Sequence, residues 1–347
     1  MKFKLKVTRV QVERLLVMAS AALVVALALR GGETAMSRYE DMQLAKSASA
    51  VTLPTAVPAE TQPVTVYYQD GEGYLVPVTT RVEKTDGIAK AALSLLVQSP
   101  DNDAAAARMG LRPCVPEGTT FDLDISNGRA RVDLGKEALS CKDAEQESLM
   151  VMAVSQTLNE FPTVKEVSFL FDGQSRSRLT HGTDVSGTFK ANDINMETVT
   201  TFDGSDANAA TVKLYFPSQT GRMLVPVTRL VYSDADPVTA MVELCRGPRS
   251  DSGLERSVPE GCGLKSVKMK NGVVSIDLTG EFNKDTGGDR LQMLRAIVFT
   301  ASQFPGVKEV KLSVEGQPYA LPEQATSAWI NTDTEVMSYY PGVIETD

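Results

Sequence analysis

The sequence predicts an α+β protein built from two tandem copies of one folding unit, and two observations carry this prediction. The segment NEFPTVKEVSFLFDGQ at 159–174 recurs at 302–317 as SQFPGVKEVKLSVEGQ, and three shorter blocks recur in the same order: LVPVT, VPEG and Asn-Gly. The offset between copies stays between 143 and 149 residues. That period is too long for a solenoid repeat of about 20 to 50 residues, but it suits a domain of about 100 to 150.

Each copy is predicted to open with a β-hairpin. In the first copy, a β-branched and aromatic run at 64–68 is followed by a glycine-containing turn and a second run at 74–82. Pro77 and its counterpart Pro226 lack the amide proton of a sheet ladder, so the second strand is predicted at an edge or a bulge. An apolar edge strand with unpaired backbone groups is a natural docking surface for another chain. The candidate docking residues are Leu75, Val76, Pro77, Val78, Leu224, Val225, Pro226 and Val227.

A helix is predicted next in both copies. In the first it covers 88–97 and is stopped by Ser99-Pro100. In the second, Asp236-Pro237 places a capping acid before a first-turn proline, and Gly247-Pro248 ends the helix. The apolar stripe of this second helix is predicted to be Val238, Met241, Val242 and Cys245.

The remainder of each copy is predicted as a loop, a hairpin, a longer helix and a last strand. The hairpin closes at Asn127-Gly128, because Asn-Gly accepts the positive φ of a tight turn. The helix at about 145–160 ends at Phe-Pro, and the strand follows at 167–171. Each unit is therefore predicted as β-β-α-β-β-α-β, with two helices packed on one face of a small mixed sheet.

The amino terminus predicts export. Five basic residues among the first fourteen precede an apolar run, Leu15 to Leu29, so everything after Arg30 is expected outside the membrane. The run is shorter than the roughly 20 residues of a span, and Ala26-Leu27-Ala28 suits a cleavage site, so an uncleaved anchor and a secreted, cleaved form both stay open. No cysteine follows the run, which excludes a lipidated amino terminus here. The predicted divisions are signal or anchor 1–30, tether 31–62, first unit 63–190, linker 191–210, second unit 211–320 and tail 321–347.

The charge argues against a nucleic-acid partner. Residues 1–30 hold six basic residues and one acid, a net of +5, so the total of −9 leaves −14 for the rest of the chain. An acidic surface repels phosphate backbones and anionic headgroups, which restricts membrane contact to the amino-terminal segment.

Four cysteines, two in each unit, are candidates for disulfides. Cys114 with Cys141 and Cys245 with Cys262 would close the shortest loops, while buried free thiols are the alternative. No C-x-x-C occurs and His181 is the only histidine, so neither a metal nor another cofactor is predicted.

Catalytic residues are not predicted either. The best candidates are two carboxylate pairs, Glu117 with Asp133 and Glu260 with Asp277. The glutamates lie in Pro-Glu-Gly turns and the aspartates on the polar faces of strands, where acids are ordinarily solvated. The chain is therefore predicted not to be an enzyme.

The duplicated motifs resemble the GerM domain family. The likeness rests on the two opening strands, the Val-Pro-Glu-Gly turn, the Asn-Gly hairpin, and Phe-Pro-Thr-Val-Lys-Glu-Val followed by Asp172-Gly-Gln174. The segment 181–186 also resembles the closing segment of the family, which the second copy lacks. The resemblance implies exported, membrane-attached proteins of sporulation and spore germination, with a fold like the ring-building modules of the complex between mother cell and forespore. The tandem sporulation protein of this family is typically a lipoprotein, a feature that this sequence lacks.

Together these features predict a non-enzymatic scaffold outside the membrane. The expected partners are envelope or sporulation proteins, and two like modules suit divided or bivalent docking. A homo-oligomer is compatible with this arrangement. The alternative is a cell-wall module that binds peptidoglycan or supports a wall hydrolase.

Overall fold

The computed structural model of the 347-residue chain describes residues 60–190, 194–197, 209–284, 288–328 and 330–332. The chain divides into two units, residues 1–59 and residues 60–347, and every described residue belongs to the second unit. The predicted signal or anchor and nearly all of the predicted tether thus lie outside the described residues. No helix among the described residues is both long enough and apolar enough to cross a membrane.

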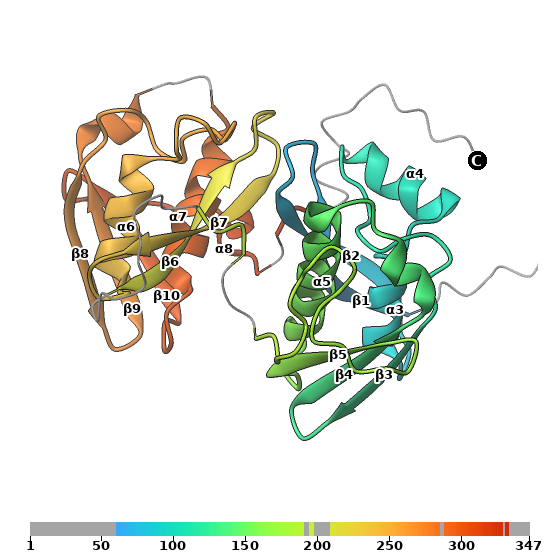
Figure 1. Cartoon of the computed structure of the whole chain (residues 1–347). Coiled ribbons are helices and arrows are strands. Elements are labelled where there is room, and N and C mark those ends of the chain that lie inside the picture. Colours follow the sequence, from blue (N-terminus) through green and yellow to red (C-terminus); the bar gives the residue numbers. More distant parts are fainter. Residues whose placement is uncertain (1–59, 191–193, 198–208, 285–287, 329, 333–347) are drawn as a thin grey trace, which may run out of the picture. The chain divides into compact units, whose positions relative to one another are not determined.

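The first repeat keeps the predicted order of elements and adds one helix (Figure 1). Its elements are β1 (Thr61–Gln69), β2 (Leu75–Glu83), α3 (Ile88–Ser94), α4 (Pro100–Arg108), β3 (Phe121–Ser126), β4 (Arg129–Leu134), the 3-10 helix η1 (Lys136–Ser140), α5 (Ala144–Asn159) and β5 (Glu166–Phe171). Strand β4 pairs antiparallel with β3 and parallel with β5, which confirms a small mixed sheet. Strands β1 and β2 form a separate two-stranded sheet, so the single sheet predicted for each unit is wrong in this detail.

The second repeat has the same arrangement without a counterpart of α4 among its described residues. Its elements are β6 (Ala210–Pro217), β7 (Leu224–Val231), α6 (Pro237–Arg246), β8 (Leu264–Lys270), β9 (Val273–Leu278), the 3-10 helix η2 (Gly280–Asn283), α7 (Arg290–Ser302), β10 (Glu309–Val314), β11 (Gln317–Tyr319) and α8 (Glu323–Thr326). Strands β6 and β7 pair with each other, and β8 to β10 repeat the mixed sheet with β11 added at its edge.

Helix α4 occupies a segment that the sequence predicts as a loop. The Ser99 hydroxyl accepts a hydrogen bond from Asn102 N at 3.2 Å, and Pro100 is the first helical residue. A serine cap followed by proline starts a helix, because proline has no N–H to lose at that position and its fixed φ suits the first turn. Helix α3 ends at Ser94, before the predicted end at residue 97, so Ser99-Pro100 begins α4 but does not end α3.

The central helix of each repeat, α5 or α7, is tied to the first strand of that repeat at a matching threonine. Tyr67 N donates to the buried Thr157 hydroxyl at 3.2 Å, and Tyr215 N donates to the buried Thr300 hydroxyl at 3.3 Å. Because these amides point at the helix, they do not point at β2 or β7. The two tyrosines lie opposite Pro77 and Pro226 in their ladders. The prolines thus occupy positions where no ladder hydrogen bond is needed, which confirms that β2 and β7 are edge strands.

Candidate docking surfaces

The predicted docking strands are edge strands, but they are not exposed. Each of the eight candidate residues, Leu75 to Val78 and Leu224 to Val227, is buried. Their outer backbone groups are paired with two short segments of the same chain, Ile194–Asn195 and Ile330–Asn331. The unpaired edge that the sequence predicts is therefore absent from this part of the structure.

Asn195 bonds to both docking strands at once. Its side-chain oxygen accepts from Leu75 N at 2.9 Å, and its amide nitrogen donates to Leu75 O at 2.9 Å and to Pro226 O at 2.7 Å. Leu75 belongs to the first repeat and Pro226 to the second. One asparagine side chain thus replaces the ladder partner that each strand lacks at this point.

Asn331 makes the reciprocal set of bonds. Its oxygen accepts from Leu224 N at 2.8 Å, and its nitrogen donates to Leu224 O at 2.7 Å and to Pro77 O at 2.9 Å. The side chain is 2% exposed. Leu75 and Pro77 of the first repeat match Leu224 and Pro226 of the second, so the two asparagines make equivalent sets of bonds. We call Asn195 and Asn331 together the asparagine clasp.

The isoleucine that precedes each asparagine completes the clasp. Ile194 exchanges hydrogen bonds with Thr228, whose N and hydroxyl both bond to Ile194 O, at 3.1 and 2.8 Å. Thr79 N donates to Ile330 O at 2.9 Å in the same way. Both asparagines have positive φ, 51° and 47°, a conformation that asparagine tolerates better than most residues. The clasp has a sequence pattern, an Ile-Asn pair that occurs twice. Both pairs lie in segments predicted as a linker and a tail, so the sequence did not predict the clasp.

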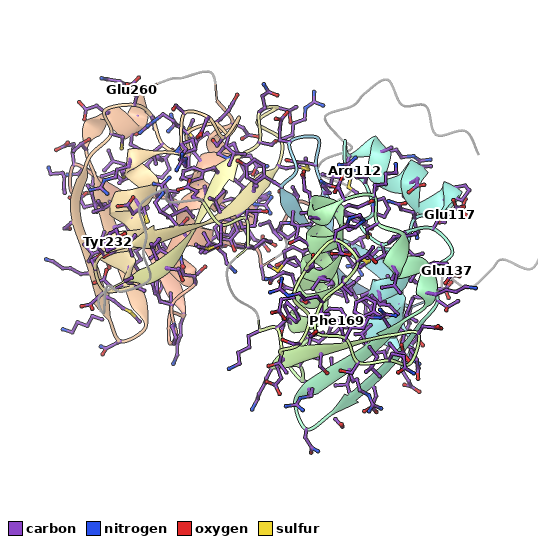
Figure 2. All side chains as sticks on the ribbon, in the orientation of Figure 1. Arg112, Glu117, Glu137, Phe169, Tyr232 and Glu260 are labelled. Atoms are coloured by element: carbon purple, nitrogen blue, oxygen red, sulfur yellow. The ribbon has the colours of Figure 1, made fainter. Side chains whose placement is uncertain are left out.

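An exposed apolar face lies on the second repeat. Tyr232, Val238 and Val242, which we call the α6 face, are 53%, 44% and 36% exposed. They make up half of the large apolar residues that are exposed in the described part of the chain. They line a groove of about 570 Å³ between α6 and the end of β7, and Tyr232 is labelled in Figure 2. Of the predicted buried stripe, Met241 is buried, but Val238 and Val242 are exposed, because Ala240 and Leu244 complete the buried face instead.

The first repeat shows that the fold does not require this apolar face. The buried residues Ala92, Leu93 and Leu96 match Ala240, Met241 and Leu244 at a constant offset. By the same offset, Lys90 stands where the second repeat has Val238, and Ser94 where it has Val242. Both are exposed, and Lys90 pairs with Asp122 at 2.9 Å. The apolar side chains are therefore particular to the second repeat.

A network of arginines and glutamates borders the α6 face. Arg229 contacts Glu197 at 2.6 Å and Glu243 at 3.1 Å, and Arg246 also pairs with Glu243. Burial alone would lower the pKa of Arg229, but its hydrogen bonds to the two glutamates outweigh burial and raise it. Arg249 adds a third cation to the lining. Arg249 pairs with Asp251 at 3.1 Å, so the three arginines are balanced by Glu197, Glu243 and Asp251.

In each candidate carboxylate pair, the aspartate has a structural role. Asp133 accepts from Gly173 N at 3.0 Å, and Asp277 accepts from Gly316 N at 2.9 Å. Each bond closes the tight turn that follows the parallel strand of its mixed sheet, β5 or β10. The hydrogen bond from Gly316 N lowers the pKa of Asp277, with a further contribution from Ser313. The glutamates of the pairs, Glu117 and Glu260, are exposed at the surface of their repeats (Figure 2).

His181 is held in a loop of the first repeat. Its N donates to Glu147 Oε1 at 3.0 Å, its Nε2 lies 2.7 Å from Cys141 O, and Thr183 N donates to Glu147 Oε2 at 3.1 Å. Glu147 is 1% exposed. Burial alone would raise the pKa of Glu147, but the hydrogen bonds from His181 and Thr183 outweigh it and lower the pKa. This carboxylate anchors the closing segment at 181–186.

The structure has all four cysteines as free thiols, the alternative to the two candidate disulfides. Cys114 Sγ faces Tyr67 O at 3.8 Å, whereas Cys141 Sγ lies 4.0 Å from Met150 Sδ, so these two thiols have different neighbours. Burial raises the pKa of Cys114 to about 12. Burial and the nearby Cys262 raise the pKa of Cys245 to about 11. Among the described residues, no cluster of histidine, cysteine and acidic side chains is arranged to hold a metal ion.

Comparisons with known proteins agree with the tandem arrangement. The family model described as "Germane: Sporulation and spore germination" matches residues 65–177 and 213–320. The chain is 31% identical over 262 residues to the spore germination protein GerM of Bacillus subtilis (strain 168), covering 73% of this chain and 71% of that protein. It also resembles the solved tandem GerMN domains of the sporulation protein GerM from Bacillus subtilis, with a TM-score of 0.67, 28% identity, and coverage of 79% of this chain and 99% of that one.

Proposed function

Because this chain belongs to the Germane family of sporulation and spore-germination proteins, we propose that it is a non-enzymatic scaffold, tethered to the membrane by its amino-terminal segment. In this proposal the two repeats lie outside the membrane and assemble with an envelope complex between mother cell and forespore. The basic and apolar pattern of residues 1–30 supports the tether.

The α6 face is the observation that carries the scaffold proposal. Three exposed apolar side chains are grouped on one groove of the second repeat, at positions where the first repeat has polar residues. Grouped apolar exposure is typical of a surface that another protein covers. Because Arg246 and Arg249 are already paired with Glu243 and Asp251, the partner segment is recognised mainly through apolar contacts.

The asparagine clasp favours the α6 face over the edges of β2 and β7 as the surface on which a partner docks. It covers the edges of β2 and β7, so strand addition at LVPVT would require Asn195 and Asn331 to leave. The α6 face needs no such rearrangement. Helix-in-groove or loop contacts at α6 are therefore favoured over strand addition at the edges.

The test places a photocrosslinking residue at Tyr232, which lines the same groove, in the full-length chain in sporulating cells. A specific protein adduct at this position is expected, and the matched control carries the same residue at Ile125, an exposed apolar position on β3 of the first repeat. Val238→Lys combined with Val242→Ser transplants the first repeat's residues. These changes should abolish the adduct and reduce the yield of heat-resistant spores. A normal adduct and normal spore yield in this double variant would refute the role of the α6 face.

The second candidate is a cell-wall module that binds peptidoglycan or supports a wall hydrolase. Sedimentation of the full-length chain with purified peptidoglycan separates the two candidates. If the chain sediments with the wall and gives no protein adduct at any surface position, the wall module replaces the scaffold.

A further inference from the structure

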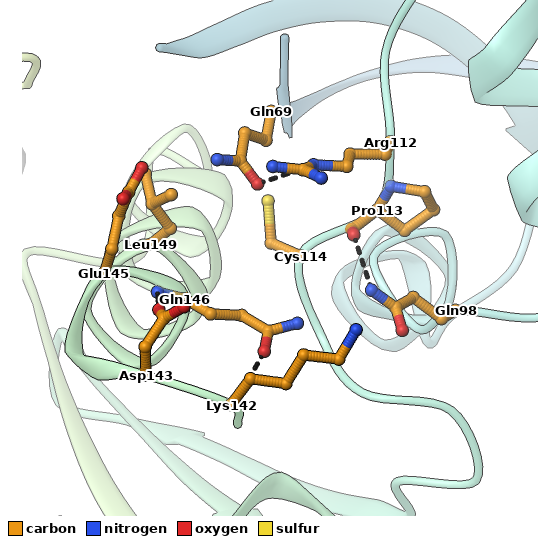
Figure 3. Close-up of a pocket in the computed structure, with 10 residues that line it drawn as sticks. All are labelled: Gln69, Gln98, Arg112, Pro113, Cys114, Lys142, Asp143, Glu145, Gln146 and Leu149. Atoms are coloured by element: carbon orange, nitrogen blue, oxygen red, sulfur yellow. Dashed lines mark hydrogen bonds between the residues drawn. The ribbon is translucent and has the colours of Figure 1, made fainter. Parts of the chain in front are cut away.

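A polar pocket of about 260 Å³ lies in the first repeat, away from the α6 face (Figure 3). Its walls come from the end of β1, the loop at 112–114 and the first turns of α5. Three glutamines, Gln69, Gln98 and Gln146, contribute amide groups to these walls. Pro113 and Leu149 supply the apolar part of the lining. The pocket therefore presents donors, acceptors and a small apolar patch together.

Charged groups of both signs surround the pocket. Arg112 and Lys142 carry positive charge, and neither has an ion pair with any residue in the described part of the chain. Glu145 carries an equally unpaired carboxylate, and Figure 3 shows it on the α5 side, across from Arg112. Arg112 is held in place, because its Nε donates to the buried Gln69 Oε1 at 2.8 Å. Its remaining guanidinium nitrogens are available to a ligand.

The second repeat shows that this side-chain set is not needed for folding. Arg112 N donates to Gln69 O at 2.8 Å, and the matching bond in the second repeat runs from Glu255 N to Pro217 O at 2.9 Å. The same backbone bridge thus forms with a glutamate in place of the arginine and a proline in place of the glutamine. The charged residues around the pocket are an addition to the first repeat and not part of its framework.

We propose that this pocket binds a short zwitterionic peptide. Arg112 and Lys142 would receive its carboxylate, since a guanidinium suits a carboxylate through paired hydrogen bonds. Glu145 would receive its ammonium group. The glutamine amides match the hydrogen bonds of a peptide group. The volume of about 260 Å³ lies just below the roughly 300 to 1,000 Å³ of small-molecule sites, which limits the ligand to about one or two amino acids.

The experiment is isothermal titration of the full-length chain in detergent with L-alanyl-L-alanine. Three further probes are N-acetyl-alanyl-alanine, which lacks the ammonium group, alanyl-alanine amide, which lacks the carboxylate, and free alanine, which lacks the peptide group. Binding of the dipeptide is expected, with each of the three altered probes at least about tenfold weaker.

Single substitutions test which side chain binds the carboxylate of the dipeptide and which binds its ammonium group. Arg112→Gln should weaken the dipeptide about tenfold and leave the amide probe unchanged, while Glu145→Gln should weaken the dipeptide and leave the N-acetyl probe unchanged. Glu255→Gln, at the matching position of the second repeat, should change nothing. Arg112→Lys keeps the charge and should retain most of the affinity, which separates lost binding from lost folding.

Two results would overturn the proposal. One is the absence of dipeptide binding at concentrations up to about 10 mM. The other is equal binding of inorganic phosphate and the N-acetyl probe, which would make the pocket a simple anion site. Because the α6 face is on the other repeat, neither result bears on the scaffold proposal.

Discussion

Replacing Asn331 by alanine should open the asparagine clasp at one of its two halves. The change removes three hydrogen bonds, one from Leu224 N and two to the carbonyls of Leu224 and Pro77. A buried hydrogen bond contributes a net of about 1 kcal/mol, so the loss is about 3 kcal/mol. Asn331 also has a φ of 47°, and alanine in this region costs about 1 kcal/mol more. Asn331→Ala should therefore lower the free energy of opening by about 4 kcal/mol, and Asn331→Gly by about 3.

Hydrogen exchange of the backbone amides, followed by mass spectrometry, measures this loss where it occurs. The Leu224 amide bonds directly to Asn331, so its exchange in the glycine variant should accelerate by about 150-fold if exchange proceeds through local opening. The Leu75 amide, which bonds to Asn195, is the internal control. It should change much less in this variant and should respond instead to Asn195→Gly. Unchanged protection of Leu224 in Asn331→Gly would refute the view that the clasp holds these strands.

Three further predictions concern the first repeat and the thiols. Ser99→Ala should destabilise the chain by about 1 kcal/mol through loss of the α4 cap, measured as a lower urea midpoint, whereas Ser99→Asp should retain the cap. The pKa of Glu147 is lowered in the folded state, so its contribution to stability is present above its ordinary value of 4.5 and is lost as the pH falls through the lower folded value. Exchange at His181 and Thr183 should accelerate over that acidic range, and Glu147→Gln should abolish the pH dependence. With free thiols and a Cys114 pKa of about 12, iodoacetamide at neutral pH should spare Cys114 in the folded chain and label four cysteines in denaturant without reductant. Only two or no labelled cysteines in denaturant would show that disulfides form.

The local elements of the fold follow from patterns that lie close together in the sequence. Asn127 and Asn271 have φ of 52° and 54°, as the predicted Asn-Gly hairpins require. The proline at 77 correctly placed β2 at an edge. The family resemblance is confirmed by the match over both repeats. The predicted unit boundaries at 63–190 and 211–320 stay predictions, as does the amino-terminal tether.

The features that the sequence did not predict have two causes. Some depend on contacts between distant parts of the chain, and others on local patterns that fit two different structures. The separate sheet of β1 and β2 has its outer edge covered by Asn331, which lies 254 positions from Pro77 in the chain. No local pattern reports such a contact. Helix α4 was missed because Ser99-Pro100 suits both the end of one helix and the start of the next. The spacing of Val238 and Val242 fits either face of α6, and only the packing of Ala240 and Leu244 shows which face is buried.

The candidate site was predictable only in part. The sequence correctly predicts that each LVPVT segment is an edge strand. It also predicts that another protein covers this edge, whereas segments of the same chain cover it. The pocket in the first repeat brings together Gln69, Arg112 and Glu145, which are separated by more than 30 residues at each step. None of them belongs to a recognisable motif. At the matching backbone bridge of the second repeat, Pro217 and Glu255 stand in place of Gln69 and Arg112.

The placement of Asn195 has a consequence for how such proteins can diverge. The asparagine bonds to both LVPVT strands before the chain enters residues 198–209, so the geometry of this junction is set upstream of the connection. Insertions or deletions in the connection then leave the bonded geometry unchanged. Relatives are therefore expected to vary freely in the length of this segment while keeping an Ile-Asn pair on its amino-terminal side, and a shortened connection should be tolerated where loss of the pair is not.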